Sequence, residues 1–292
     1  MRVVVALGGN ALIKKGQEGK EGEQRKNVER AIFEILPILN KNEVVITHGN
    51  GPQVGNLLLQ QKGSKVKMPI AVLTAMTQGQ IGHWIVSALT NRGKKAVAVI
   101  THVFVDAKDP KSFQKTKPVG PVYKKKISSD LMYEKGRGWR KFVSSPIPVD
   151  IEEKDRIVSL LDSGFVVVAC GGGGIPVIRK KYGIESMEGV IDKDRASALL
   201  AKKINADLLV ILTDVPYAYI NFGKAGQKPI RKISWRKAKK LLERGKFGEG
   251  NMAPKIEAAL EFSRSKKGRK SIICSFDNFR EAIKEKGGTI IV

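Results

Sequence analysis

The sequence is short of acidic residues, and this shortage sets its charge. Asp and Glu total 28 against 53 Lys and Arg, which gives a formal net charge of +25 and a pI of about 10.0. Much of the excess lies in two basic runs, 228–246 and 264–270. Neither run interleaves aromatic residues as a base-stacking surface would. We therefore expect a solvated basic face with weak, non-specific affinity for nucleic acid and no specific nucleic-acid partner.

Cysteine and histidine are scarce, which argues against two kinds of site. The two cysteines, Cys170 and Cys274, lie in apolar strand-like contexts, so we expect buried free thiols rather than a disulfide. The three histidines, His48, His83 and His102, form no Cys/His spacing typical of a zinc site, and no metal-ligating residues are predicted. Chain order suggests no Ser-His-Asp arrangement, although such an arrangement stays open.

Long hydrophobic runs are also missing. The apolar runs are four to six residues long, too short to span a bilayer. The stretch MRVVVALGGN reads as a strand and lacks the longer apolar region and cleavage site of a secretory signal. We expect a cytoplasmic protein with no membrane partner.

The sequence does contain a regular alternation of short apolar strands and amphipathic helices. Strands are expected at 2–7, 43–47, 95–105 (one strand or a pair), 165–170, 206–215, 270–275 and 288–292. Helices are expected at 21–41, from about 53, and at 71–91, 151–164, 192–204, 234–245 and 252–266. This order predicts an α/β fold with a parallel sheet covered by helices on both faces. The apolar stretch 81–89 is a candidate interface or ordinary core.

The alternation breaks between residues 106 and 151. This segment is rich in Pro, Gly, Ser and Lys, with short strand-like pieces. A long irregular insertion in a compact α/β chain is usually a lid or a small subdomain.

Glycine-rich turns follow three of the expected strands. They are Gly8-Gly9-Asn10, Gly49-Asn50-Gly51 and 171–174. Each alone reads as a tight connection, but three at one sheet edge favour a phosphate or carboxylate site. The sequence contains no Walker A loop, no G-x-G-x-x-G fingerprint and no HRD or DFG signature, so the common nucleotide motifs do not explain them.

Three lysines stand beside Gly, Pro or apolar residues rather than in charge runs. Lys117 lies in TKPVGP, Lys193 at the expected start of a helix in VIDKDRAS, and Lys255 in GNMAPK. Phosphoryl transfer requires cations around the moving group and little covalent participation from the protein. Asp194 and Asp214 could orient these lysines or meet a magnesium ion. For each lysine taken singly, an ordinary surface position is the simpler reading.

Taken together, these segments resemble the carbamate kinases, a branch of the amino acid kinase family, over essentially the whole chain. The matching segments are VVVALGGNAL, VVITHGNGPQVGNLLLQ, AMTQGQIG, DPKSFQKTKPVGPVY, GRGWRKFVSSPIP, VVVACGGGGIPVI, EGVIDKDRASALLA, ADLLVILTDV and MAPKIEAALEF. The resemblance implies one domain over 1–292, a three-layer αβα sandwich with a mainly parallel central sheet, from which 106–151 protrudes as a small subdomain. It also implies a homodimer and MgATP chemistry, with ATP/ADP and Mg²⁺ as cofactors and carbamate or carbamoyl phosphate as the substrate.

The resemblance also assigns roles to individual residues. The implied substrate site is lined by Gly8, Gly9, Asn10, Gly49, Asn50 and Gly51. The implied catalytic set is Lys117 from the protrusion, Lys193 and Lys255 on the nucleotide phosphates, and Asp194 holding the lysines. Asp214, Val215 and Met252 are implied to lie beside the nucleotide. Many members of the family carry a lysine where this sequence has Ala6, and Lys117 would take over its work.

Two alternatives stay open on the sequence alone. The first is another kinase of the amino acid kinase family that phosphorylates a different carboxylate or phosphate. The second is a non-catalytic, basic protein that binds anions or nucleic acid. The joint presence of Lys117, Lys193, Asp194 and Lys255 argues against the second.

Overall fold

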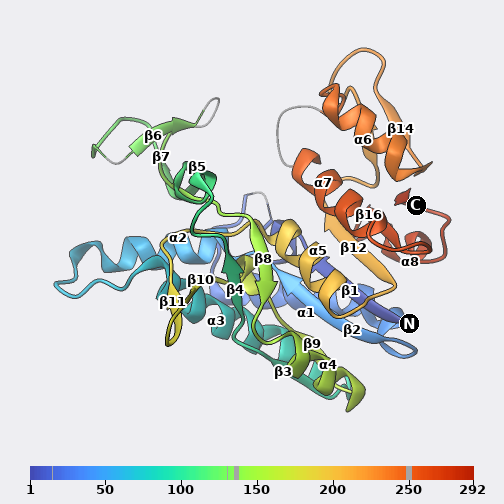
Figure 1. The fold of residues 1–292 in the computed structure, drawn as a ribbon, viewed down its shortest axis with the longest axis horizontal. Helices are drawn as coiled ribbons and strands as arrows, with labels where there is room; N and C mark the ends of the chain where they lie inside the picture. The colour runs from blue at the N-terminus through green and yellow to red at the C-terminus, as the bar shows by residue number, and fades with distance from the viewer. Residues whose placement is uncertain (15, 130, 135–137, 248–251) are drawn as a thin grey trace.

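A computed structural model describes residues 1–14, 16–129, 131–134, 138–247 and 252–292. Within these residues an eight-stranded sheet forms the centre of the molecule (Figure 1). Its strands, in order across the sheet, are β15 (Lys232–Ile233), β17 (Thr289–Ile291), β16 (Lys270–Ser275), β12 (Leu208–Thr213), β1 (Arg2–Leu7), β2 (Glu43–His48), β9 (Val166–Val168) and β3 (Ala96–Ala98). The strands from β16 to β3 run parallel, and only β15 and β17 run against them.

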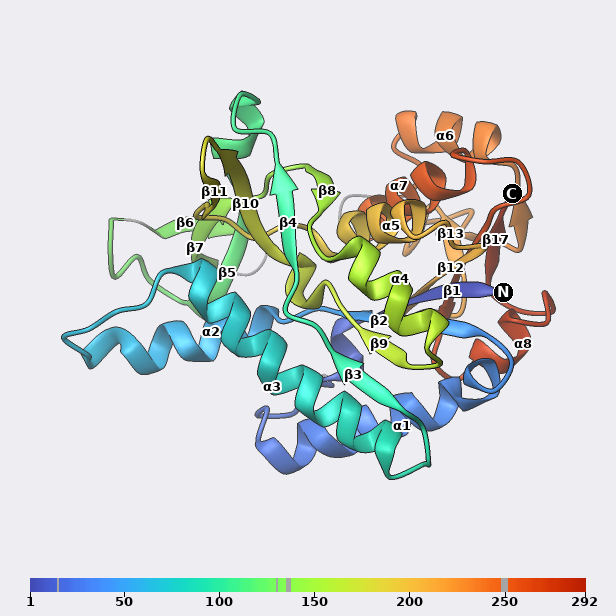
Figure 2. The same cartoon turned by 60° about the horizontal axis from the view of Figure 1, so that its bottom comes forward.

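Side chains alternate between the two faces of this sheet, so each face builds its own core. Val3 and Val5 of β1 pack with helices α1 (Glu21–Leu39), α3 (Ile70–Thr90) and α8 (Phe279–Ala282). The intervening Val4 and Ala6 pack toward the other face, whose helices are α4 (Lys154–Asp162), α5 (Lys193–Lys203), α6 (Trp235–Glu243) and α7 (Met252–Ser263). Figure 2 shows α1 and α3 on one side of β1 and β2, and α5 and α7 on the other. The predicted αβα sandwich with a mainly parallel sheet is confirmed.

Three smaller sheets complete the described part of the chain. A four-stranded sheet contains β11 (Gly183–Ser186), β10 (Ile175–Lys180), β4 (His102–Val105) and β8 (Pro148–Ile151). A three-stranded antiparallel sheet contains β5 (Lys115–Tyr123), β7 (Gly138–Ser144) and β6 (Leu131–Glu134), and a hairpin joins β13 (Ala218–Ile220) to β14 (Lys228–Ile230). The β5–β7–β6 sheet stands away from the main sheet, and β5 contacts α2 (Gly51–Gln60) (Figure 1).

The segment 106–151 therefore contains two kinds of strand. Its first three strands form the outlying sheet, whereas β8 pairs with β4 in the four-stranded sheet. The treatment of 106–151 as one protruding subdomain stays a prediction, because its last strand is shared with the body of the molecule.

Several local expectations change in the structure. The stretch 95–105 is a strand pair, with β3 in the main sheet and β4 in the four-stranded sheet. The glycine turn is a short 3₁₀ segment, Gly171–Gly173, and it leads directly into β10, where no strand was expected. Three further 3₁₀ turns are Gly9–Ala11, Gln61–Gly63 and Pro110–Phe113.

Two exclusions drawn from composition can be compared with the structure. No helix of the described residues combines the length and the apolar character that crossing a membrane requires. Cys170 and Cys274 are buried free thiols, as expected, and burial raises the pKa of Cys274 to about 12. The stretch 81–89 belongs to the core on the α1 side, since Ile81, Ile85 and Leu89 are fully buried there.

Candidate active site

The ends of three parallel strands bring the predicted glycine turns to one edge of the main sheet. Gly8 follows β1, Gly49 follows β2, and the third turn follows β9 after Ala169 and Cys170; Asp214 follows β12 at the same edge. The first of these turns requires glycine, because a Cβ on Gly8 would lie 2.6 Å from the carbonyl oxygen of Leu212 on the neighbouring strand. At Gly9 a Cβ would meet no atom within 4 Å, so this part of the turn borders open space. The close approach of β1 and β12 thus places a bare main chain at the sheet edge where ligands usually bind.

The second turn connects β2 to α2 and is packed from behind by the four-glycine turn. The buried side chain of Asn50 donates from Nδ2 to Thr77 Oγ1 at 2.9 Å. A Cβ on Gly172, which has a φ of +66°, would lie 2.1 Å from Asn50 Nδ2. Gly171 and Gly172 therefore serve close packing against this turn, whereas Gly173 and Gly174 pack closely against Ile191 and Val103. Asn50 offers a ligand its main chain, because its side chain is already engaged.

The start of α5 is tied to both the sheet and the second turn. Asp192 caps the helix, and its Oδ1 accepts from the main-chain N–H of Asp194 at 2.9 Å and of Arg195 at 3.3 Å. Ser197 Oγ lies 2.6 Å from Thr47 Oγ1 at the end of β2. The N-terminus of α5 consequently faces the glycine turn after β2, and a Cβ on Gly49 would lie 3.4 Å from Lys193 Cδ.

The three predicted lysines converge on two carboxylates at the N-terminus of α5. Lys193 Nζ pairs with Asp194 Oδ1, and Lys255 Nζ donates to Asp194 Oδ2 at 2.9 Å. Lys117 Nζ donates to Asp192 Oδ2 at 3.0 Å. The lysines come from three elements, β5, α5 and α7, that are far apart in the sequence. Lys117, Lys193, Asp194 and Lys255 are thus brought together as one cluster.

The electrostatics of this cluster favour an anionic ligand. Burial opposes ionisation of Asp194, but the charges of Lys193 and Lys255 hold the pKa of its carboxyl below the ordinary value. Burial is also the largest influence on Lys193, and it lowers the pKa of that ammonium group. Three ammonium groups share two carboxylates, so one positive charge is left uncompensated. A buried, partly compensated cation is stabilised by a phosphoryl group or another oxyanion.

His48 supports the second turn as a neutral side chain. Its ring is buried, and burial lowers the pKa of His48 to about 4. Nδ1 lies 2.9 Å from the carbonyl oxygen of Gly49, so Nδ1 carries the proton and donates. His48 therefore holds the backbone of the turn and supplies no charge near neutral pH.

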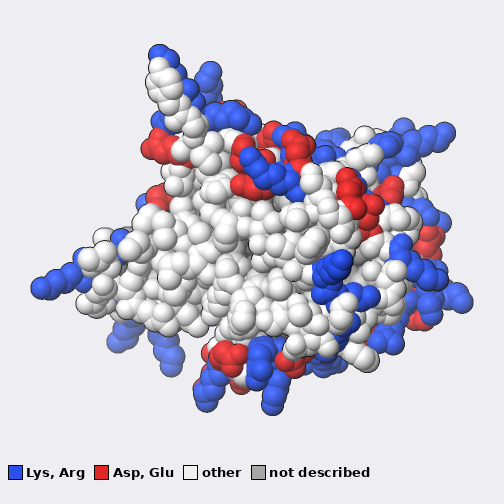
Figure 3. All heavy atoms as spheres, turned by 90° about the horizontal axis from the view of Figure 1, so that it is seen from below, with Lys and Arg blue, Asp and Glu red and all other residues white. Residues whose placement is uncertain are grey.

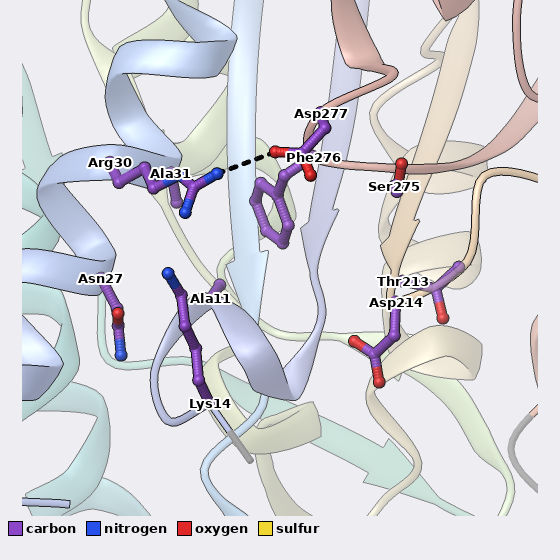
Figure 4. A pocket seen from close by; sticks show the side chains of 10 residues that line it. All are labelled: Ala11, Lys14, Asn27, Arg30, Ala31, Thr213, Asp214, Ser275, Phe276 and Asp277. Atoms are coloured by element: carbon purple, nitrogen blue, oxygen red, sulfur yellow. Dashed lines mark hydrogen bonds and ion pairs between the residues drawn. The ribbon is translucent and has the colours of Figure 1, made fainter. Parts of the chain in front are cut away.

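Other predicted residues lie at the same edge but outside the lysine cluster. Asp214 and Val215 follow β12 directly, and Asp214 lines a separate pocket on the α1 side (Figure 4). Met252 begins α7, one turn before Lys255. The side chain of Asn10 lies outside what the structure describes.

Asp192 is the residue of this cluster that the sequence analysis did not single out. Its two oxygens have different partners, the helix N-terminus and Lys117. The signal was present in IDKDR, because an aspartate just before a helix start is a strong N-cap residue. Its second partner, from β5, could not be inferred from that spacing.

Comparison with known proteins agrees with the geometry. The sequence matches the amino acid kinase family over residues 1–275. It is 43% identical to the carbamate kinase of Thermococcus kodakarensis, with 100% of this chain and 99% of that one covered. It is 42% identical to the carbamate kinase of Pyrococcus horikoshii, with 99% and 98% covered. The carbamate kinase from Giardia lamblia bound to AMP-PNP superimposes with a TM-score of 0.92 at 39% identity, with 100% and 98% covered.

The chain therefore belongs to the amino acid kinase family. Within that family, its full-length identity places it with the carbamate kinases, which are ATP-dependent phosphotransferases. The resemblance drawn from the motifs is confirmed at the level of family, fold and enzyme class. The roles of the individual site residues stay predictions.

Proposed function

We propose that this protein catalyses reversible phosphoryl transfer between ATP and carbamate, with carbamoyl phosphate and ADP as the other pair. The observation that carries the proposal is the convergence of Lys117, Lys193 and Lys255 on Asp192 and Asp194, next to the glycine turn after β2. The carbamate kinases that match the chain from end to end support the choice of acceptor.

The proposed mechanism is direct in-line transfer. An oxygen of carbamate attacks the γ-phosphorus of ATP, the bond from that phosphorus to the bridging oxygen breaks, and ADP leaves with the electron pair. Main-chain N–H groups at Gly8, Gly9, Asn10 and at 49–51 hold the acceptor and the transferred group. The lysines neutralise charge that grows on the phosphoryl oxygens, which is where preorganised donors contribute most.

Each lysine has a distinct place in this proposal. Lys193 and Lys255 bind the nucleotide phosphates, and Asp194 fixes both because each of its oxygens holds one of them. Lys117 reaches the transferred group from β5. Ala6 is fully buried in the core on the α5 side, so β1 supplies no cation at its carboxyl end and Lys117 takes that part. Asp214, Val215 and Met252 lie beside the nucleotide.

Mg²⁺ enters this scheme as part of the substrate MgATP. In the part of the chain that the structure describes, no group of three or more His, Cys, Asp or Glu side chains is arranged to hold a metal ion. Both carboxylates of the cluster already hold ammonium groups. The phosphates and water would therefore supply most ligands of the ion, which commonly keeps several waters.

We further propose a cytoplasmic homodimer. One face of the molecule, formed by α3, β3, β4 and β10, shows a broad area with few charged atoms (Figures 2 and 3). Exposed apolar side chains gather there: Val72, Ile100 and Ile184 line one hollow, and Met76 is exposed one helical turn after Val72 on α3. An apolar area rimmed by charge is typical of a protein interface, and a second copy of the chain is the proposed occupant.

The activity test is ATP formation from ADP and carbamoyl phosphate by purified protein. ATP is measured by a luciferase readout, with acetyl phosphate in place of carbamoyl phosphate as the matched control. We expect ATP with carbamoyl phosphate and little with acetyl phosphate. The reverse preference would assign the protein to another acceptor within the same family, and no ATP from either donor would remove the kinase proposal.

A further inference from the structure

A second pocket opens at the carboxyl edge of the main sheet, on the α1 side. Its volume is about 330 Å³, and it lies between α1 and the ends of β12 and β16 (Figure 4). It is lined by Ala11, Lys14, Asn27, Arg30, Ala31, Thr213, Asp214, Ser275, Phe276 and Asp277. The lysine cluster of the phosphoryl site is built on α5 and α7, which cover the opposite face of the sheet. The pocket is therefore a separate feature of the same edge.

The charges around this pocket are of both signs. Arg30 Nη2 and Asp277 Oδ1 form an ion pair at 2.9 Å, so these two side chains satisfy each other. Among the residues that the structure describes, no ion-pair partner belongs to Lys14 Nζ or to the Asp214 carboxylate. Figure 4 shows Lys14 on the α1 side with Arg30, and Asp214 across the pocket beside Thr213. The pocket thus presents one cation and one carboxylate on facing walls.

The rest of the lining is apolar or neutral. Ala11 and Ala31 are almost fully buried, and their small side chains leave the space that a larger residue would fill. The ring of Phe276 stands between the charged walls (Figure 4). The hydroxyl groups of Thr213 and Ser275 lie on the Asp214 side. An apolar middle with a few polar groups at its ends is the usual composition of a small-molecule site.

We infer that this pocket binds a small zwitterion of the amino-acid class, with its carboxylate toward Lys14 and its ammonium group toward Asp214. A polyanion fits poorly, because Asp214 would repel it. A plain cation fits poorly, because Lys14 would repel it. A ligand with separated opposite charges and an alkyl chain between them satisfies both walls and lies along Phe276.

The test uses 6-aminohexanoate as the probe and isothermal titration calorimetry as the measurement. Hexanoate and hexylamine are the matched ligands, since each lacks one of the two charges. A hydrogen bond to a charged group is worth roughly 1.5–3 kcal/mol, so we expect each of them to bind about tenfold more weakly or worse. Equal affinity for 6-aminohexanoate and hexanoate, or no saturable binding of 6-aminohexanoate, would overturn the inference.

Two variants locate the binding in the protein. Lys14→Ala removes the cation that faces the pocket, and we expect it to weaken 6-aminohexanoate about tenfold or more. Lys26→Ala removes the same charge from an exposed position of α1 outside the lining, and it should leave the affinity unchanged. Equal losses in both variants would mean a general charge effect and no site at Lys14.

A competition experiment separates this pocket from the proposed nucleotide site. Because Asp214 stands beside both, ADP is titrated in the presence of saturating 6-aminohexanoate. We expect both ligands to bind together. Mutually exclusive binding would place the pocket within the nucleotide site and overturn the inference. A purified protein that binds 6-aminohexanoate but shows no kinase activity would contradict only the proposed function.

Discussion

At the scale of single residues, the catalytic proposal depends on how carboxylates distribute three ammonium groups. Asp194 holds two of them, and Asp192 holds Lys117. Lys117 is the member of the set that a local motion could release, because it comes from the outlying sheet and its side chain is 29% exposed, against 14% for Lys193 and 10% for Lys255. Lys117, the cation that a local motion could most readily release, is thus the one assigned to the transferred phosphoryl group.

Lys117→Ala tests this assignment. Removing one preorganised donor from a transition state typically costs about 2.7–4 kcal/mol, so kcat should fall roughly 100- to 1,000-fold. The measurement is steady-state ATP formation, with circular dichroism to show that the fold is kept. Lys115→Ala is the control, since that lysine is exposed on the same strand. A kcat near the wild-type value would remove Lys117 from the mechanism.

His48 leads to a prediction about stability and pH. Its pKa is about 4 in the folded protein and 6.5 in the reference state, so only the unfolded chain binds the proton between these values. Above pH 6.5 the histidine is neutral in both states, so it does not change the free energy of unfolding. As pH falls from 6.5 toward 4, the free energy of unfolding should drop by about 3 kcal/mol on account of this group.

Urea unfolding at several pH values measures this drop. His48→Gln carries no titrating group at this position, so the difference in stability between pH 6.5 and 4 should shrink in that variant. If the free energy of unfolding of His48→Gln falls with pH as steeply as that of the wild type, other groups cause the acid sensitivity.

At the scale of elements, the N-terminus of α5 has two tasks that one residue performs. Asp192 caps the helix with one oxygen and holds Lys117 of β5 with the other. Asparagine caps a helix about as well as aspartate but lacks the charge. Alanine neither caps the helix nor carries a charge. Substitution at this position can therefore separate the stability of α5 from the placement of Lys117.

The expected pattern distinguishes the two variants. Asp192→Asn should keep the melting temperature near that of the wild type and lower kcat, because Lys117 loses its ion pair. Asp192→Ala should lower kcat as well and also cost about 1 kcal/mol of stability through the lost cap. Thermal unfolding and ATP formation are measured on both. Full activity in Asp192→Asn would show that the pair with Lys117 has no part in positioning it.

The elements also show how far the sequence could lead. The strands and helices with clear periodicity were predicted, among them β1, β2, α1 and α5, because their own residues define them. Strand β10 was not among the expected strands, because its short apolar run directly follows four glycines. The packing reason for Gly171 and Gly172 lies in the side chains of His48 and Asn50, more than a hundred positions earlier.

In the candidate site, too, the features set by local sequence were predicted, and those set by contacts between distant segments were not. Lys117, Lys193 and Lys255 stand out by their local context and by the family motifs. The partner of Lys117 could not be predicted, because it depends on the contact of the outlying sheet with α5 across 75 positions. The pocket at Lys14 was also invisible, since its lining comes from α1 and from the ends of two strands.

At the scale of the whole molecule, the sparsely charged face bears on assembly. If a second copy covers it, light scattering should give twice the monomer mass of 32.0 kDa. Met76, with 49% of its surface exposed, lies on α3 in that face. Met76→Lys places a charge there and should shift the population toward monomer.

The control for assembly is Phe222→Lys. Phe222 is also exposed, but it follows β13 in the hairpin away from this face, so the mass should stay at that of the dimer. A monomeric wild type would end the proposal, and so would a dimer that Met76→Lys leaves intact at low concentration.

The order of strands in the main sheet has a consequence for synthesis in the cell. Val3 of β1 lies beside Leu208 of β12, and β17 sits between β15 and β16. At 5–20 residues per second, a ribosome takes about 10 to 40 seconds to travel from the first of these strands to its partner. During that interval one edge of β1 has no neighbour, and the part of the hydrophobic interior contributed by β12, β16 and α7 is still unmade. Recovery of soluble material should therefore respond to translation speed and to chaperones that shield nascent chains.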